Sequence, residues 1–292
     1  MRANRFSVGG LPAVAIARAS ADLKQSLLDS VDAIGGLEGL SLRGETVLLK
    51  PNFNSADPPP GSSDPLFVGA LVELLRDYGA AKVVIGESSM LASSTRRILA
   101  KAGMLAAAQQ AGADVMVFDR WEKRHVGGRY LKDVSFARAA LEASRIVYSA
   151  CLKTHRFAEF TGSLKLSVGF VRPRERLLLH ARNLSGKVAD LNTLVNPDLI
   201  LLDGRAAFIA GGPSSGERRE PGLILASGDR VAIDIEAVKL IQSYPGNSLA
   251  SKDPWQLGQI RRAVELGLGA GQETDYRVVQ QSVVLELFTG ER

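Results

Sequence analysis

Residues 45–53 read ETVLLKPNF, residues 67–80 read FVGALVELLRDYGA, and residues 81–89 read AKVVIGESS. The first and last of these segments are short apolar runs, which are typical of buried strands. The middle segment spaces its apolar residues three and four positions apart, as an amphipathic helix does. This strand–helix–strand order predicts two parallel strands joined by a crossover helix, and therefore a parallel sheet.

The same alternation extends along the chain on both sides of this unit. Helices are predicted from ADLKQSLLDSVDAIGGL (21–37) and STRRILAKAGMLAAAQQAGA (94–113), and strands from PAVAIARA (12–19), DVMVFDR (114–120), SRIVYSACL (144–152), NPDLILLDG (196–204) and YRVVQQSVVLELF (276–288). The segment from Thr154 to about Arg182 shows no clear period and is expected to be irregular. We therefore expect an α/β protein with a mostly parallel sheet covered by helices.

The domain organisation is expected to be simple. No internal repeat, low-complexity tract or clear linker interrupts the 292 residues, so residues 1–292 are predicted to form a single domain. Within it we expect two Rossmann-like lobes, residues 1–145 and 146–292, with a cleft between them.

The composition is that of an ordinary globular protein, with 46% hydrophobic and 23% charged residues. No apolar run approaches the roughly 18–20 residues that a membrane span needs, and a cytoplasmic protein is expected. The single cysteine, Cys151, excludes an internal disulfide framework and a cysteine-ligated iron–sulfur cluster within one chain. We expect Cys151 to be a small buried residue.

The net charge of +5 favours an anionic partner. Four arginines, Arg172, Arg174, Arg176 and Arg182, cluster near His180 and form either a solvated face or a site for a small carboxylate or phosphate. Aromatic residues make up only 6% of the chain, and no basic–aromatic pattern is present. Nucleic acid is therefore not expected as a partner.

Polar loops follow three of the predicted strands, at residues 50–65, 86–89 and 153–155. Ligands of parallel sheets bind beyond the carboxyl ends of the strands, so these loops are expected to share one edge. The side chains that we expect to bind a substrate there are Lys50, Asn52, Ser63, Lys153, Thr154, Thr161 and Arg174. Helix capping by the Ser63-Asp64-Pro65 segment is the structural alternative for Ser63.

Residues 152–180, LKTHRFAEFTGSLKLSVGFVRPRERLLLH, contain two of the three histidines. Imidazole moves protons near neutral pH or binds a metal, and a partly desolvated lysine acts as a base or holds an anion. We therefore assign candidate catalytic roles to His155, Lys165 and His180, with His155 and His180 also as candidate metal ligands. The structural alternatives are a histidine at the edge of the core, a surface lysine and a histidine at a helix end.

The ordered segments VLLKPNF, SSDP, VVIGESS, CLKTHRFAEFTGSLK, GFVRPRERLLLH, DLNTLVNPDLILLDG, GGPSSG and ASGDRVAID resemble the family called domain of unknown function 362. The resemblance extends through nearly the whole chain. Many relatives carry a ferredoxin-like segment with clustered cysteines, which this chain lacks. The family has asparagine directly after the lysine, where this chain has Leu166.

The first half is also distantly similar to the amino-terminal domain of lactate racemase, in which a His…Gly…Lys segment precedes another histidine. By position, His155, Lys165 and His180 match that enzyme's metal-binding and catalytic histidines and lysine. This similarity implies a divalent metal or a metal-bearing organic cofactor.

Two functions are compatible with these patterns. The first is a small-molecule enzyme that carries out acid–base chemistry, isomerase-like or racemase-like, on an anionic substrate, with or without a metallocofactor. The second is a noncatalytic ligand-binding or partner module of an iron–sulfur or redox system, whose cysteine-bearing segment lies on another polypeptide.

Overall fold

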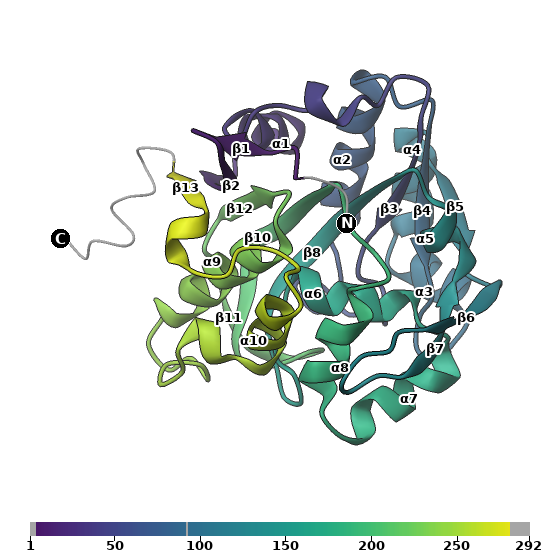
Figure 1. Cartoon of the computed structure of the whole chain (residues 1–292). Coiled ribbons are helices and arrows are strands. Elements are labelled where there is room, and N and C mark those ends of the chain that lie inside the picture. The colour runs from purple at the N-terminus through teal and green to yellow at the C-terminus, as the bar shows by residue number, and fades with distance from the viewer. Residues whose placement is uncertain (1–3, 92, 281–292) are drawn as a thin grey trace.

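One continuous sheet forms the centre of the protein in the computed structural model, which describes residues 4–91 and 93–280 (Figure 1). Its main strand order is β1-β2-β12-β10-β8-β3-β4-β5, and the run from β10 to β5 is parallel. The bounds are β1 (Ser7–Val8), β2 (Leu11–Arg18), β3 (Thr46–Lys50), β4 (Lys82–Glu87), β5 (Asp114–Val117), β8 (Arg145–His155), β10 (Leu199–Gly211) and β12 (Leu223–Ser227). Three short strands join its sides, namely β9 (Glu159–Thr161), β11 (Gly216–Arg219) and β13 (Arg277–Gln280). A separate hairpin pairs β6 (Trp121–His125) with β7 (Asp133–Ala137).

Helices cover both faces of this sheet (Figure 1). One face carries α1 (Leu23–Asp32), α2 (Pro65–Asp77), α3 (Thr95–Lys101) and α4 (Met104–Ala111). The other carries α5 (Arg138–Glu142), α6 (Ser163–Leu166), α7 (Pro173–Ala181), α8 (Leu184–Leu191), α9 (Arg230–Gln242) and α10 (Gly258–Glu265). Along β3, Val47 and Leu49 pack into the first core and Leu48 into the second, which explains why the strand is apolar throughout. The predicted α/β fold with a helix-covered, mostly parallel sheet is confirmed.

The segment from Thr154 to Arg182 is structured, so the prediction of an irregular region is wrong. It holds the end of β8, then β9, α6, a 3-10 helix over Ser167–Phe170, and α7. All of these except α7 are too short to give a clear period in the sequence. Pro173 occupies the first turn of α7, where its missing N–H leaves no hydrogen bond unmade.

The predicted boundary near residue 145 coincides with the start of β8. Because β8 pairs with β3 on one side and with β10 on the other, the sheet continues across this boundary. The division into lobes 1–145 and 146–292 stays a prediction.

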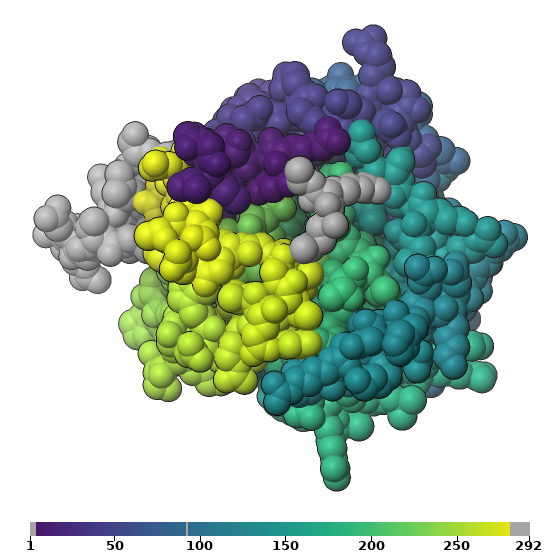
Figure 2. All heavy atoms as spheres, viewed as in Figure 1, coloured from purple at the N-terminus to yellow at the C-terminus, as the bar shows by residue number. Residues whose placement is uncertain are grey.

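The first and last strands of the described chain lie side by side at one end of the sheet. β13 pairs in parallel with β2, and the last described residues lie against the N-terminal strands on the surface (Figure 2). Of the strand predicted over residues 276–288, residues 281–288 lie outside the described residues. No helix in the described part of the chain is long and apolar enough to cross a membrane.

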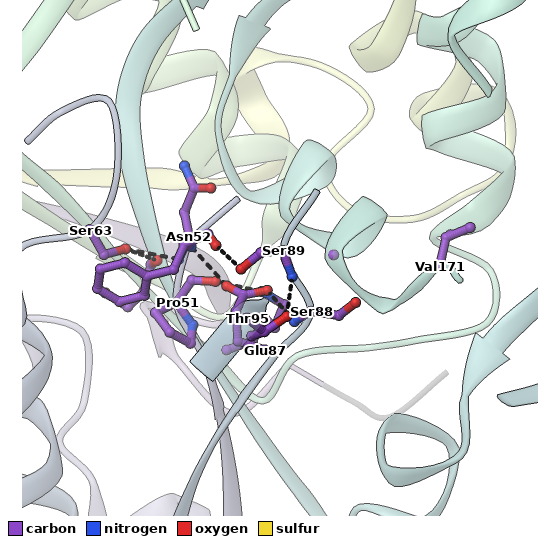
Figure 3. Close-up of polar contacts among 12 residues, drawn as sticks. Pro51, Asn52, Ser63, Glu87, Ser88, Ser89, Thr95 and Val171 are labelled. Atoms are coloured by element: carbon purple, nitrogen blue, oxygen red, sulfur yellow. Dashed lines mark hydrogen bonds and ion pairs between the residues drawn. The ribbon is translucent and has the colours of Figure 1, made fainter. Parts of the chain in front are cut away.

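A buried ion pair ties the ends of β3 and β4 together. The Lys50 Nζ donates to Glu87 Oε1 at 2.8 Å, and neither side chain is more than 2% exposed. Glu87 also accepts the backbone N–H groups of Phe53, at 2.8 Å, and Ser88, at 2.7 Å. One carboxylate thus fixes the loops that follow β3 and β4, and Figure 3 shows Glu87 beside the Pro51–Asn52 loop.

We expect Glu87→Gln to lower the free energy of unfolding by about 3–5 kcal/mol, because it leaves the Lys50 ammonium buried without a counter-ion. Urea unfolding measures the change. The double variant that adds Lys50→Met should recover part of the loss, since no buried charge then remains. A double variant less stable than Glu87→Gln alone would contradict this account of the pair.

Candidate functional site

A cavity of about 360 Å³ opens at the carboxyl edge of the parallel strands. Lys50 is the last residue of β3, Glu87 is the last residue of β4, and Lys153 and His155 lie at the end of β8. All four side chains line the cavity. The three polar loops that were expected to share one edge of the sheet therefore contribute to a single cavity.

Seven of the predicted site residues line this cavity. They are Lys50, Asn52, Lys153, His155, Thr161, Lys165 and His180. The two imidazoles and the ammonium of residues 152–180, although 10 to 25 positions apart in the chain, thus face a common space. Their chemical roles stay predictions.

Ser63 and Thr154 do not line the cavity. The Ser63 Oγ accepts the backbone N–H of Asn52 at 2.9 Å, so Ser63 holds the loop that carries Asn52 (Figure 3). Thr154 lies between Lys153 and His155 on β8, and neighbouring side chains of a strand point to opposite faces. Neither residue is therefore placed to contact a ligand in this cavity.

Arg174 also lies outside the cavity. The arginine of α7 that lines the cavity is Arg176. The face of α7 toward the cavity consists of Pro173, Arg176, Leu177 and His180, which is the spacing of one helix face. Arg174 is off this face and exposed. The four-residue spacing between Arg176 and His180 was the sequence signal that distinguished the two arginines.

Arg176 is fixed in place by backbone carbonyls. Its guanidinium donates to the carbonyl oxygens of Val171 and Gly169, each at 2.8 Å, and of Ser88 at 2.6 Å. Burial lowers the pKa of Arg176 to about 10, so the side chain keeps its positive charge at neutral pH. It joins α7 to the loop after β4.

Lys165 stands on α6, whose position depends on a residue 69 places further along the chain. Asp234 of α9 is fully buried and accepts the backbone N–H groups of Ser163 at 2.6 Å and Leu164 at 3.0 Å. This side-chain cap satisfies the first amides of a helix too short to be stable alone. Burial raises the pKa of Asp234 to about 7.

The Lys165 ammonium has no hydrogen-bond or ion-pair partner within residues 4–91 and 93–280. Burial, together with the nearby cations Lys153 and Arg176, lowers the pKa of Lys165 to about 7. Lys153 differs, because its Nζ donates to the carbonyl oxygen of Gly61 at 2.5 Å. Among the described residues, Lys165 is thus an ammonium group without a counter-ion, and its charged neighbours Lys153 and Arg176 are also positive.

His155 presents a hydrogen-bond donor to the cavity. Its Nδ1 accepts the backbone N–H groups of Phe157 and Ala158, both at 3.1 Å, so the proton of the neutral ring is on Nε2. Burial and the positive charge of Lys165 lower the pKa of His155 to about 3, so the ring is neutral at physiological pH. These bonds also close the turn between β8 and β9.

His180 has the opposite tautomer. Its Nδ1 lies 2.7 Å from the carbonyl oxygen of Arg176, which can only accept, so Nδ1 carries the proton. The Nε2 of the neutral ring therefore has a free lone pair. One histidine of the cavity offers a donor and the other an acceptor.

The hydrogen bonds of His155 do not fit the predicted metal role. A metal ligand needs an unprotonated ring nitrogen, and freeing Nε2 of His155 would break both bonds to the backbone amides. Of the two histidines that line the cavity, only His180 has a ring nitrogen available for a metal. No group of three or more histidine, cysteine, aspartate or glutamate side chains that could hold a metal occurs in the described part of the chain.

The charge balance of the cavity favours an anion. Among its described lining residues, Lys50, Lys153, Lys165 and Arg176 are cations and Glu87 is the one carboxylate. Glu87 follows the apolar run VVIG as Lys50 follows VLL, so the same reasoning could have identified it from the sequence. The buried Thr161 Oγ1 also lines the cavity region and has no hydrogen-bond partner in the structure.

Structural comparison matches two solved structures. The lactate racemase apoprotein from Thermoanaerobacterium thermosaccharolyticum gives a TM-score of 0.51 at 14% identity, covering 80% of this chain and 57% of that chain. A protein from Thermotoga maritima gives a TM-score of 0.47 at 10% identity, covering 75% of this chain and 57% of that chain. The chain thus spans little more than half the length of these proteins, and the first likeness supports the fold alone.

Sequence comparison finds a curated relative and a family. A thylakoid-associated protein of Synechocystis sp. is 27% identical over 258 residues, which are 84% of this chain and 78% of that protein. The family model described as "Domain of unknown function (DUF362)" matches residues 47–239, from β3 into α9. The resemblance predicted from the ordered sequence segments is confirmed, and the chain belongs to the DUF362 family.

Proposed function

We propose that this chain is an enzyme that binds a small organic anion in the cavity and carries out acid–base chemistry on it. The observation that carries the proposal is the unpaired Lys165 ammonium, which stands among three further cations and one carboxylate. A bound carboxylate or phosphate would give this ammonium a charge-assisted hydrogen bond.

The lining residues divide into fixed and available donors. Lys50 and Arg176 use their donors on Glu87 and on backbone carbonyls, so they act mainly through their charge. Within the described residues, the Lys165 ammonium and the Thr161 hydroxyl have no hydrogen-bond partner, so both are available to bind the anionic group. The anion would therefore lie closest to Lys165 and Thr161.

The same residues suit proton transfer at neutral pH. With a pKa of about 7, Lys165 exists in both protonation states, as an efficient acid–base group requires. In the fraction of the complex in which Lys165 is neutral, the charges of Lys50, Lys153 and Arg176 would hold the anionic head, and the Lys165 amine would take a proton from the substrate. The electron pair of the broken bond stays on the substrate, and the resulting ammonium would return the proton. The Nε2–H of His155 would stabilise the charge that forms, and the Nε2 of His180 would serve as a second base.

Lactate and other 2-hydroxy carboxylates are the first substrates to test, because the fold neighbour is named a lactate racemase. A divalent metal or a metal-bearing organic cofactor stays a prediction. When bound, such a group supplies a Lewis acid, and His180 is the lining residue with a free lone pair.

Two further expectations stay predictions. One is a noncatalytic partner module of a redox system. Such a module requires no anion in the cavity, so calorimetric titration with an anion separates it from the enzyme. A cytoplasmic location is the other, and the curated relative is itself named thylakoid-associated.

We expect Lys165→Met to weaken lactate binding about 10- to 100-fold at pH 6.5, because a charge-assisted hydrogen bond is lost. Isothermal titration calorimetry measures the affinity. Arg174→Met removes an exposed cation outside the cavity and is the matched control, with affinity unchanged. Equal binding by Lys165→Met and the wild type would refute the assignment.

Binding should also depend on pH in a defined direction. Since the folded-state pKa of Lys165 is about 7, the free protein loses this charge above pH 7 and lactate affinity falls, by up to about tenfold per pH unit. Lactate itself stays ionised throughout. Lys165→Arg, which stays charged, should show a flat profile between pH 6 and pH 9.

The proton-transfer step predicts exchange with solvent. We expect 2-hydroxy carboxylates incubated with the protein in D₂O to gain deuterium at the carbon that bears the hydroxyl, as followed by mass spectrometry. Lys165→Met should slow this exchange about 10²- to 10⁴-fold, and Arg174→Met should not. Anion binding without exchange of any tested carboxylate would leave a binding protein rather than this enzyme.

Finally, Lys165→Met should make the folded protein more stable at pH 6, by about 1–3 kcal/mol, because it removes a desolvated cation. The pKa of Lys165 is about 7 in the folded state and 10.5, its ordinary value, in the unfolded state. Between these two pH values the unfolded state binds the extra proton, so the wild type gains stability as the pH rises from 7 toward 10.5. The advantage of Lys165→Met should therefore shrink by pH 10. Calorimetric unfolding at both pH values tests this, and a constant difference would contradict it.

A further inference from the structure

The mouth of the cavity is apolar, in contrast to its charged interior. Four of the large apolar side chains exposed to solvent line the cavity, namely Met90 (43% exposed), Leu91 (48%), Phe157 (69%) and Leu177 (65%). We call these four residues the apolar collar. Lys50 and Lys153 line the same cavity but are only 1% and 2% exposed, so the charges lie deep and the collar lies at the opening.

The collar is assembled by the fold. Met90 and Leu91 follow β4, Phe157 lies in the turn between β8 and β9, and Leu177 lies on α7. A single exposed apolar residue is ordinary, whereas four from three separate segments around one opening form a patch of the kind that marks a binding site. The collar and the cations share one cavity, so one ligand can contact both.

We propose that the ligand of this site is an amphiphilic organic anion, with its oxyanion head among the cations and an apolar chain between the collar residues. This inference rests on the anion site proposed above and adds the class of substrate. The head is a carboxylate or a phosphate, which the cations bind through the same chemistry. Burial of the chain removes both the ligand's apolar surface and the collar from water.

The test is a series of straight-chain carboxylates, acetate, butyrate, hexanoate and octanoate, titrated calorimetrically at pH 6.5. Affinity should rise about fourfold with each methylene that the collar buries. Butyl phosphate and inorganic phosphate form a second arm. Valerate, the carboxylate with the same butyl chain, is the matched ligand for butyl phosphate. Tighter binding of butyl phosphate than of valerate identifies phosphate as the head, and the reverse order identifies carboxylate.

Two collar variants and one matched control locate the chain. Leu177→Ser and Phe157→Ser should each weaken octanoate binding about tenfold and leave acetate binding unchanged. Leu178→Ser alters a residue of α7 that is 68% exposed but lies outside the cavity lining, and it should change neither affinity. Lys165→Met should weaken both ligands by the same factor. Thermal unfolding of each variant checks that it is folded.

The outcomes separate the two proposals. Equal affinity along the carboxylate series, or octanoate binding that Leu177→Ser does not change, overturns the amphiphilic ligand and leaves the anion site standing. Octanoate binding that depends on the collar but not on Lys165 overturns the anion site. Failure of every carboxylate and phosphate to bind overturns both.

Discussion

The burial of several positive charges at one edge of the sheet is the constraint on which the site depends. A buried cation is costly unless a counter-ion or several acceptors surround it. Lys50 is paired with Glu87, Lys153 donates to a backbone carbonyl, and Arg176 donates to the carbonyls of several residues. Lys165 is the cation of the cavity that receives no such compensation within the described residues, so the remaining electrostatic cost is concentrated there.

Close approach of the backbone makes this arrangement possible at two glycines. A Cβ on Gly169 would lie 2.5 Å from Cε of Lys50, so any larger residue would displace the buried ammonium. A Cβ on Gly162 would lie 2.3 Å from Oδ1 of Asp234, which would separate that carboxylate from the amides of α6. Both glycines lie in the segment that carries Lys165, and both serve packing around charged groups rather than an unusual backbone angle.

The cavity presents three kinds of surface, and each could bind a different part of a ligand. Its interior is cationic, its two histidines present a donor and an acceptor, and its mouth is apolar. Exposed apolar side chains and an unpaired ammonium both lower the stability of the empty protein. Proteins retain such features at functional sites and compensate for them elsewhere, which is why their coincidence at one opening supports a ligand.

The sequence by itself determined the alternation of strands and helices and the edge of the sheet where polar loops converge, and it placed two histidines and a lysine close together in residues 152–180. These features are local, because the period of apolar residues records which side of a strand or helix is buried. Only the tertiary structure decided which charges enter the cavity. The four-residue spacing to His180 puts Arg176, and not Arg174, on the same helix face as that histidine, but only the packing of α7 against the loop after β4 turns this face toward the cavity. Likewise, α6 forms because Asp234 reaches it from α9, and a contact between residues so distant in the chain leaves no local pattern to read.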